Sequence, residues 1–190
     1  MLKKYIGLDK IANRVILNIG SASDVIDPAV INLDVIYTPN VDIIADGTNL
    51  PFTDSQFDAV ISDMTLEHVK DQQKMMDEFR RILKPGGLLY VSVPFMTPYH
   101  SAPGDYNRWT KDGLAYAFGD YEIMELGTRD GPASGLAYIL VDFFALLFSF
   151  GIEILRKAMI VFFLVVFSPI KLLDLFMIHL PASHVVAGMV

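Results

Sequence analysis

The stretches Phe57–His68 (FDAVISDMTLEH) and Leu83–Pro94 (LKPGGLLYVSVP) decide the fold of this chain. Each contains an apolar run typical of a buried strand, and residues 71–83 between them repeat apolar side chains at helical spacing. This order predicts one strand–helix–strand crossover of a parallel sheet. Because ligands of such sheets bind at the carboxyl ends of the strands, a functional site is expected around Ser62 and Asp63.

The predicted helix has clear boundaries. Asp71 can cap its first turn, and the Pro-Gly-Gly sequence of residues 85–87 is expected to end it, because proline lacks the amide hydrogen and glycine accepts a left-handed turn. Further helix is predicted over Lys111–Phe118, with a strand over Tyr121–Leu126 after it. Five earlier runs are candidate strands, mostly apolar on both faces as buried parallel strands are: Val15–Ile19, Ala29–Leu33, Val41–Ala45, Phe57–Ile61 and Leu88–Val93.

The connection between the first two predicted strands, residues 20–28, is unusually short. Crossovers between parallel neighbours normally need a dozen or more residues and a helix. Two interpretations follow: the helix is trimmed to a stub of a turn or two, or the two strands are not adjacent. We favour the stub.

The composition limits the classes of function. The chain has 190 residues, enough for one domain with a substantial core, but 53% of them are hydrophobic, which exceeds an ordinary soluble domain. A net charge of −7 provides no basic surface for a phosphate backbone, so no nucleic-acid partner is expected. The chain has no cysteine, which excludes disulfides, thiolate chemistry and most structural zinc sites; no metal site is predicted.

From Gly135 onward the sequence becomes strongly apolar. Residues 135–152 reach the length of ~18–20 residues that a membrane span requires, whereas the second run, residues 158–168, falls short before Pro169. A helical hairpin over 135–181 that dips into one leaflet or lies in the interface therefore fits better than two clean spans. The alternative is a helical hairpin that is buried in an oligomer.

Several short motifs occur in order from about residue 14 to about residue 130. They are Val15–Ser21 (VILNIGS), Asn32–Asp34 (NLD), Ala45–Phe52 (ADGTNLPF), Phe57–Ser62 (FDAVIS), Leu66–Val69 (LEHV) and Leu83–Gly87 (LKPGG). In this order the set resembles the class I S-adenosylmethionine-dependent methyltransferases, in the branch that acts on lipids, sugars, quinones and other small molecules. The resemblance implies a Rossmann-like α/β fold, with an open, mostly parallel twisted sheet and an antiparallel last strand.

The resemblance also implies a domain organisation. Residues 1–134 would form the methyltransferase core, residues 135–181 an inserted apolar hairpin, and residues 182–190 the antiparallel closing strand of the core.

S-adenosylmethionine is the cofactor that the resemblance implies. Gly20 would let the backbone approach the ligand closely, Asp34 would accept both ribose hydroxyls, and Asp46 would accept the adenine amine. The alternatives are purely structural: Gly20 makes a tight turn, Asp34 is a capping or solvated acid, and Asp46 and Gly47 form a simple turn. The positions expected to bind the cofactor are Asn18, Gly20, Ser21, Asp34, Asp46, Gly47, Thr48, Ser62 and Asp63.

The sequence departs from the family pattern in its first loop. The family's acid at the end of the first strand is Asn18 here, and the second glycine of the loop is Ala22. Asn18 can still form hydrogen bonds, but it provides no charge for the ammonium group of the cofactor.

The loop of residues 94–110 follows the fifth strand and is expected to overhang the cleft. His100 is the candidate base, with Asp105 orienting it or acting alone. The expected substrate-binding residues are Tyr99, Tyr106, Arg108 and Trp109. The alternative is that these side chains only pack the start of the next helix and that His100 is solvated.

Three functions remain open. The first is methyl transfer to an amphiphilic or small-molecule acceptor, such as a lipid-linked, sugar or quinone-type intermediate, by a membrane-associated protein whose catalytic domain faces the cytoplasm. The second is a non-catalytic, methyltransferase-like binding or scaffold protein with an altered cofactor loop. The third is another nucleotide-binding enzyme such as a dehydrogenase, which the missing glycines disfavour.

Overall fold

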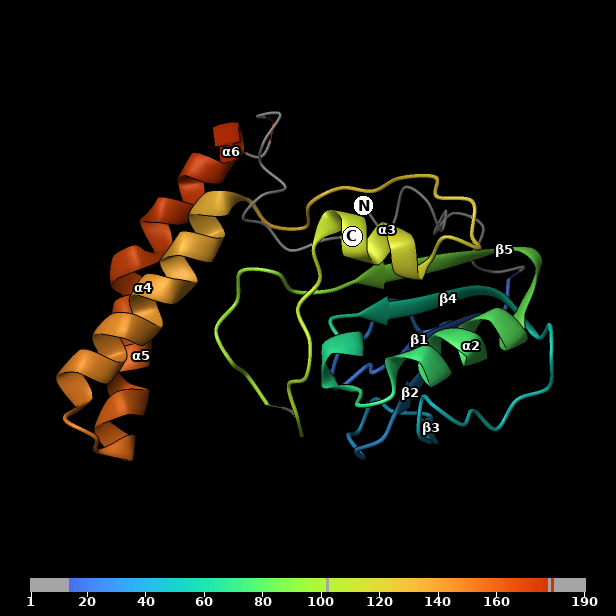
Figure 1. Ribbon diagram of the computed structural model, residues 1–190. Coiled ribbons are helices and arrows are strands. Elements are labelled where there is room, and N and C mark those ends of the chain that lie inside the picture. The colour runs from blue at the N-terminus through green and yellow to red at the C-terminus, as the bar shows by residue number, and fades with distance from the viewer. Residues whose placement is uncertain (1–13, 102, 178, 180–190) are drawn as a thin grey trace. The chain divides into compact units, whose positions relative to one another are not determined.

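The computed structural model describes residues 14–101, 103–177 and 179 (Figure 1). They fall into two compact units. Of these residues, the first unit contains 14–93, 101 and 103–107, and the second contains 94–100, 108–177 and 179.

A five-stranded sheet forms the centre of the first unit (Figure 1). Its order is β3-β2-β1-β4-β5, and every neighbouring pair is parallel. The strands are β1 (Ile16–Ile19), β2 (Ile31–Asp34), β3 (Ile43–Ile44), β4 (Phe57–Asp63) and β5 (Leu83–Ser92). This confirms the predicted Rossmann-like α/β class and places β1 between β2 and β4, where its four residues are all buried.

Helix α2 (Gln72–Ile82) connects β4 to β5, as predicted. Its N-cap is Asp71, whose side chain accepts a hydrogen bond from the Lys74 amide at 3.2 Å. The helix buries Met75, Met76, Phe79 and Ile82, the face that the sequence spacing indicates. Strand β5 begins directly at Leu83, so the Pro-Gly-Gly sequence lies within the strand, beside an irregularity in the register with β4.

The short connection from β1 to β2 contains turns and no helix. Leu17 pairs with Ile31, so the strands are adjacent, as favoured from the sequence. The predicted helical stub is reduced to turns closed by the Asp24 amide on the Ser21 carbonyl and the Val30 amide on the Asp27 carbonyl, at 2.9 and 3.0 Å. Apolar side chains take the place of the missing helix, because Val30 belongs to the core cluster on that face and Ile26 packs against it.

The predicted strand over Tyr121–Leu126 is wrong. The segment follows helix α3 (Lys111–Ala117) and begins with a turn, in which the Tyr121 amide donates to the Phe118 carbonyl at 2.9 Å and the two rings make an edge contact. Strands exist only as paired ladders, and no described strand pairs with this segment. The predicted antiparallel closing strand, residues 182–190, lies outside the described residues.

The regular secondary structure described in the second unit consists of helices. It contains the predicted helix α3 (Lys111–Ala117), capped by the Thr110 hydroxyl, which accepts from the Gly113 amide at 3.1 Å. It also contains α4 (Pro132–Ser149), α5 (Glu153–Phe167), η3 (Ser168–Leu173) and α6 (Asp174–Met177). Helices α4 and α5 form the expected hairpin, which begins at Pro132, a few residues before the expected boundary.

The two long helices of the hairpin pack through aromatic rings and small residues. Phe144 and Phe148 of α4 contact Phe163 of α5, with ring centroids 5.5 and 5.8 Å apart. By length and composition alone, Pro132–Ser149 and Glu153–Met177 could each cross a membrane.

Candidate functional site

The register of the sheet brings the predicted cofactor residues to one edge. Ile19 of β1 pairs with Leu33 of β2 and with Ser62 of β4, so Gly20, Asp34 and Ser62 stand at neighbouring strand ends. The Ala45 amide donates to the Asp34 carbonyl at 3.1 Å, which brings the segment that starts at Asp46 beside the end of β2.

Gly20 adopts a backbone conformation that other residues avoid, with φ at +73°. A Cβ at this position would lie 2.3 Å from both Cγ2 and Oγ1 of Thr65. The Thr65 hydroxyl is 3.1 Å from the carbonyl oxygens of Ile19 and Asp63, so it can donate to either strand end. Gly20 is therefore required for a close approach between the first loop and the residues after β4. The sequence gives no sign of the role of Thr65, because the two positions are far apart along the chain.

The Asp34 carboxylate organises the first loop. Its Oδ2 accepts from the Ala22 amide at 2.8 Å, and its Oδ1 accepts from the Ile36 amide at 2.9 Å. Ala22 has φ at +48°, so alanine adopts here the left-handed backbone that the glycine of the family pattern would adopt without strain. Each carboxylate oxygen keeps a second acceptor position, and Asp34 is only half-buried, so it can still accept from hydroxyl groups of a ligand.

Asn18 is buried within the sheet, where its side chain takes part in a structural hydrogen bond. Its side-chain amide donates to Asn32 Oδ1 at 3.1 Å, and both residues are buried. The amide pair cross-links β1 and β2 one residue before the end of β1 and two before the end of β2. The structure therefore explains the departure at this position as a buried hydrogen bond, which satisfies two polar groups in the core.

The Asp46–Thr48 segment forms a side-chain-closed turn. Asp46 Oδ1 accepts from the amide and the hydroxyl of Thr48, at 2.8 and 2.9 Å. A Cβ on Gly47 would lie 3.0 Å from Cε of Met75, so glycine lets this turn pack closely on α2. Asp46 itself is exposed, which leaves its carboxylate accessible to a ligand.

An arginine that the sequence interpretation missed holds the loop after this turn. The Arg81 guanidinium donates to the carbonyls of Leu50 and Phe52 at 3.1 and 2.7 Å and forms a two-pronged pair with Glu78, while Glu78 Oε2 accepts from the Leu50 amide at 2.6 Å. Hydrogen bonds from Arg81, together with that amide, hold the pKa of Glu78 below its usual value. The spacing of Glu78 and Arg81 on one helix face is the only signal that could have identified the pair.

Two buried hydroxyl groups at the strand ends have no hydrogen-bond partner among the described residues. Ser62 Oγ at the end of β4 and Ser21 Oγ after β1 are both buried and unpaired. Buried hydroxyls are rarely left unpaired in native structures, so these two atoms fit contact with a polar ligand. Asp63, the next residue of β4, accepts instead from the Ser92 hydroxyl of β5.

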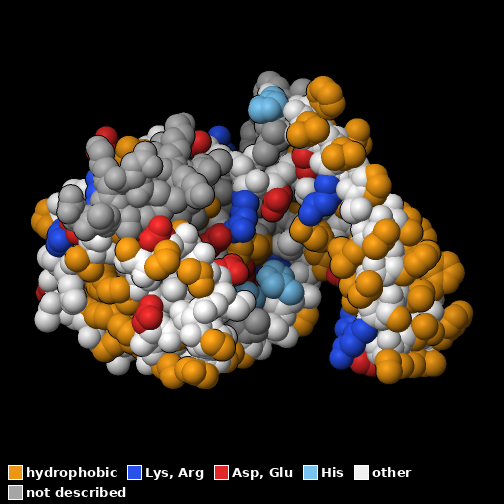
Figure 2. Space-filling view, turned by 180° about the vertical axis from the view of Figure 1, so that it is seen from behind, with side chains coloured by type: hydrophobic (Ala, Val, Ile, Leu, Met, Phe, Trp, Pro, Cys, Tyr) orange, Lys and Arg blue, Asp and Glu red, His pale blue; other side chains and the backbone are white. Residues whose placement is uncertain are grey.

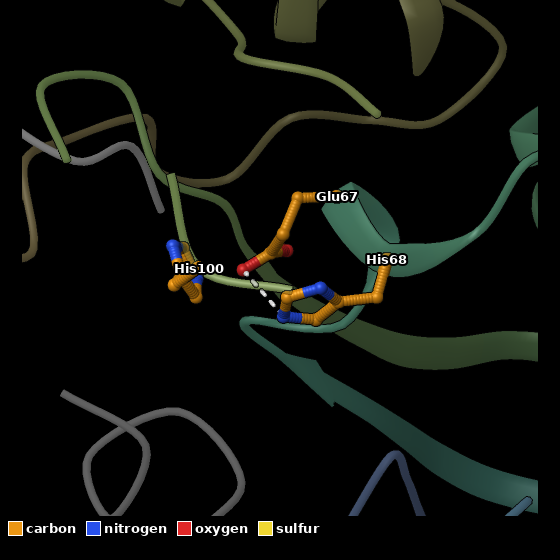
Figure 3. Close-up of side chains that lie close together, drawn as sticks. All are labelled: Glu67, His68 and His100. Atoms are coloured by element: carbon orange, nitrogen blue, oxygen red, sulfur yellow. Dashed lines mark ion pairs between the residues drawn. The ribbon is translucent and has the colours of Figure 1, made fainter. Parts of the chain in front are cut away.

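A buried acid and a histidine follow β4 in the short helix η2 (Leu66–His68), as Figure 3 shows. Glu67 is fully buried, and its Oε1 lies 3.7 Å from Nε2 of His68. His68 Nδ1 lies 2.5 Å from the Gly104 carbonyl, and the Tyr106 amide donates to the Glu67 carbonyl at 2.7 Å. His68 therefore contacts a segment that is distant in the sequence, and η2 fastens the segment that carries Asp105 within the first unit.

The predicted substrate loop is divided between the units. Asp105 and Tyr106 belong to the first unit, whereas His100 and Arg108 belong to the second. The second-unit residues of the loop are Tyr99, His100, Arg108 and Trp109.

Within the second unit, the two arms of the loop hold each other. Arg108 lies 3.2 to 3.4 Å from the carbonyls of Thr97 and Pro98, and the Trp109 amide donates to the Pro94 carbonyl at 3.3 Å. Of the four expected substrate and base residues here, Tyr99 and His100 are exposed. Arg108 thus closes a loop that presents two accessible side chains.

Comparison with known proteins agrees with this geometry. Residues 25–91 match a family model described as a methyltransferase domain, and these residues include β2 to β4, α2 and most of β5. The demethylmenaquinone methyltransferase of Renibacterium salmoninarum is 34% identical over 112 residues, which cover 52% of this chain and 47% of that protein. The chain therefore spans about half the length of this curated relative.

Two solved structures share the fold. A SAM-dependent methyltransferase from Archaeoglobus fulgidus superposes with a TM-score of 0.53 at 15% identity, covering 68% of this chain and 70% of that one. A putative methyltransferase from Bacillus halodurans gives a TM-score of 0.52 at 18% identity, covering 60% and 65%. Residues 25–91 therefore resemble a methyltransferase domain, and the two solved structures share the α/β fold of this chain.

Proposed function

We propose that this protein transfers a methyl group from S-adenosylmethionine to a small amphiphilic acceptor at a membrane surface. One observation carries the proposal: Gly20, the Asp34 carboxylate and the unpaired hydroxyls of Ser21 and Ser62 meet at adjoining strand ends of a methyltransferase fold. In open parallel sheets this edge is where nucleoside ligands bind.

The residues at this edge fit the cofactor. Asp34 would accept from the ribose hydroxyls, and the exposed Asp46 carboxylate would accept from the adenine amine. The Ser21 and Ser62 hydroxyls would pair with the polar end of the ligand, which removes the cost of leaving them buried and unpaired. When bound, the cofactor supplies an electrophilic methyl group.

The protein's share of the chemistry is alignment and, for a hydroxyl acceptor, removal of a proton. Holding two reactants in line can provide ~7–11 kcal/mol of the barrier reduction, so an acceptor that is already nucleophilic needs little more. We assign base catalysis to the exposed His100, or to Asp105, and acceptor contacts to Tyr99, Tyr106, Arg108 and Trp109. Asp105 is held near the residues after β4 by the contacts of η2.

A quinone-type acceptor is the best-supported substrate class. The name of the Renibacterium relative, demethylmenaquinone methyltransferase, points to such a molecule. The exposed apolar surface of α4 and α5 supports membrane association through residues 135–180, with the core on the cytoplasmic side. An enzyme held at the membrane would meet an apolar acceptor without extracting it into water.

The alternative is a non-catalytic binding or scaffold protein. It is favoured by Asn18, whose amide is used by Asn32 and provides no charge for the ammonium group of the cofactor. In this case the altered first loop would hold the cofactor weakly or not at all.

Calorimetry on the full chain in mild detergent separates these functions. We expect S-adenosylmethionine and S-adenosylhomocysteine to bind and NAD not to bind. Asp34→Asn should weaken binding at least tenfold, whereas Asp24→Asn, a matched change at an exposed acid of the first loop, should not. Failure of both sulfur ligands to bind would support the scaffold, and tight binding of NAD alone would support a dehydrogenase.

Activity is tested separately. The detergent-solubilised chain, incubated with methyl-labelled cofactor and a membrane lipid extract, should transfer label to a solvent-extractable product. Label that remains entirely in the aqueous phase, despite cofactor binding, would contradict the proposed acceptor class.

A further inference from the structure

We propose that the α4–α5 hairpin crosses a phospholipid bilayer completely and returns, so that its tip at Phe150–Ile152 reaches the opposite layer of headgroups. The inference rests on the membrane association proposed above but not on any catalytic activity. It differs from the expectation of a hairpin that dips into one leaflet.

The packing of α4 is inverted relative to a helix of a soluble protein. Its buried residues include Ala133, Ala137, Val141, Ala145 and Ser149, which recur every four residues as one stripe of small side chains. Its large apolar side chains point outward instead: Phe143, Leu146 and Leu147 are 59%, 66% and 53% exposed. Small residues at the helix contact and large apolar residues outside are the arrangement of helices that associate within lipid.

From Ala158 to Phe167, helix α5 is apolar all around its circumference. None of its residues is buried, and Val161, Phe162, Leu164, Val165 and Val166 are all exposed although they point in different directions around the axis. A helix that lies in the membrane interface has one polar face, which α5 lacks between Ala158 and Phe167. On the face drawn in Figure 2, hydrophobic side chains occupy much of the surface of the hairpin. This distribution fits surrounding hydrocarbon rather than an interface.

The length of α4 matches a whole bilayer. The eighteen residues of α4 span about 27 Å at the α-helical rise, close to the hydrocarbon thickness of about 30 Å. In the second arm the charge-free stretch from Ala158 to Ile170 spans about 21 Å, ten residues in α5 and three in η3. Lys157 at one end can extend toward the headgroups, and Lys171 at the other donates to the Tyr138 hydroxyl of α4 at 3.1 Å. A single leaflet, about half the thickness, is too thin for either arm.

Charges mark both ends of the hairpin. At the tip, Arg156 pairs with Glu153 through two contacts of 3.0 Å, and Lys157 lies 3.8 Å from the same carboxylate. At the root, Asp174 accepts from the amides of Ala133 and Ser134 at 2.9 and 2.8 Å and so closes the hairpin. Insertion into one leaflet would leave the three tip charges at the bilayer midplane, where ionised groups are strongly disfavoured.

Asp142 is the one charged residue within α4, and it needs a partner in a membrane. It lies seven residues before the end of α4, about 10 Å from the tip, and it interacts electrostatically with Arg156. In a full crossing Asp142 lies within the hydrocarbon, where charged residues pair with one another, and Arg156 provides the opposite charge.

The absence of cysteine from the natural chain allows a direct test with single-cysteine variants. Asp130→Cys marks the root, Ile152→Cys marks the tip with Lys157→Cys as a second tip probe, and Val165→Cys, 71% exposed in the structure, marks the middle. Each variant is produced in sealed host membrane vesicles of defined orientation and treated with a membrane-impermeant maleimide.

We expect the root and tip cysteines to label from opposite faces, each at least tenfold faster from its own face. Val165→Cys should label only after detergent is added. Labelling of root and tip from the same face, with Val165→Cys still protected, would overturn the full crossing and leave membrane association intact. Free labelling of Val165→Cys, or complete release of the chain by an alkaline carbonate wash, would overturn the membrane association itself.

Discussion

Replacement of Gly20 by alanine tests the geometry of the site most directly. The new methyl group meets two atoms of Thr65 at 2.3 Å, and a backbone with φ at +73° is unfavourable for alanine. Thr65 is branched at Cβ and cannot rotate both of these atoms away from the contact. The residue must shift and withdraw its hydroxyl from the carbonyls of Ile19 and Asp63.

The cost can be estimated from these two effects. The left-handed conformation costs roughly 1–2 kcal/mol for a residue with a Cβ, and loss of the Thr65 hydrogen bond costs about 1 kcal/mol more. Gly86→Ala provides a matched control, because Gly86 has φ at +75° and a Cβ added there would meet no atom within 4 Å. The control should therefore show only the backbone effect. Gly86 lies near the start of β5, at the end of the strand opposite to the cofactor edge.

Urea unfolding in mild detergent, followed by circular dichroism, measures the stability of both variants, and calorimetry with S-adenosylhomocysteine measures binding. We expect Gly20→Ala to be about 1 kcal/mol less stable than Gly86→Ala and to bind the ligand at least tenfold more weakly. Addition of Thr65→Ala to Gly20→Ala should recover part of the stability. Equal stability and equal affinity of the two glycine variants would refute the proposed close approach.

Three further outcomes are expected. Asp34→Asn should reduce affinity for S-adenosylhomocysteine by roughly 10- to 100-fold, because it removes a charged acceptor worth about 1.5–3 kcal/mol, and unchanged affinity in calorimetry would contradict its role. The hydrogen bond from Arg81 lowers the pKa of Glu78 below its usual value of 4.5. Glu78 therefore stabilises the fold above that pH, and this stability is lost as the pH falls through the lowered pKa. In urea unfolding, the midpoint of Glu78→Gln should depend less on acid pH than the midpoint of the natural chain. Asp174→Ala should lower stability by about 1–2 kcal/mol through loss of the cap of α4, seen as earlier melting of helical signal, and no change would exclude the cap.

Local signals predicted the elements that depend on neighbours in the chain. The capped helix after Asp71 and the helix after Thr110 have the predicted boundaries to within one residue, because caps and apolar spacing act over a few residues. The strand over Tyr121–Leu126 failed because a strand depends on a partner as well as on its own composition.

The sequence predicted only those site residues that stand at the carboxyl ends of the strands. Gly20, Asp34 and Ser62 were expected to be close because the carboxyl ends of parallel strands share one edge, and the register places them there. The pairing of Asn18 with Asn32 and the clamp of Arg81 on the Leu50 loop were not predicted, since both depend on which segments become neighbours in space.

The sequence by itself determined the class of fold, the helical hairpin and the residue types available for a nucleoside ligand, since apolar periodicity, caps and ordered motifs are local properties. Tertiary structure alone decided that Thr65 presses against Gly20, that Ala22 adopts a left-handed backbone beside Asp34, and that the small face of α4 is turned inward. These features arise from contacts between distant segments, whose register and packing no local pattern encodes.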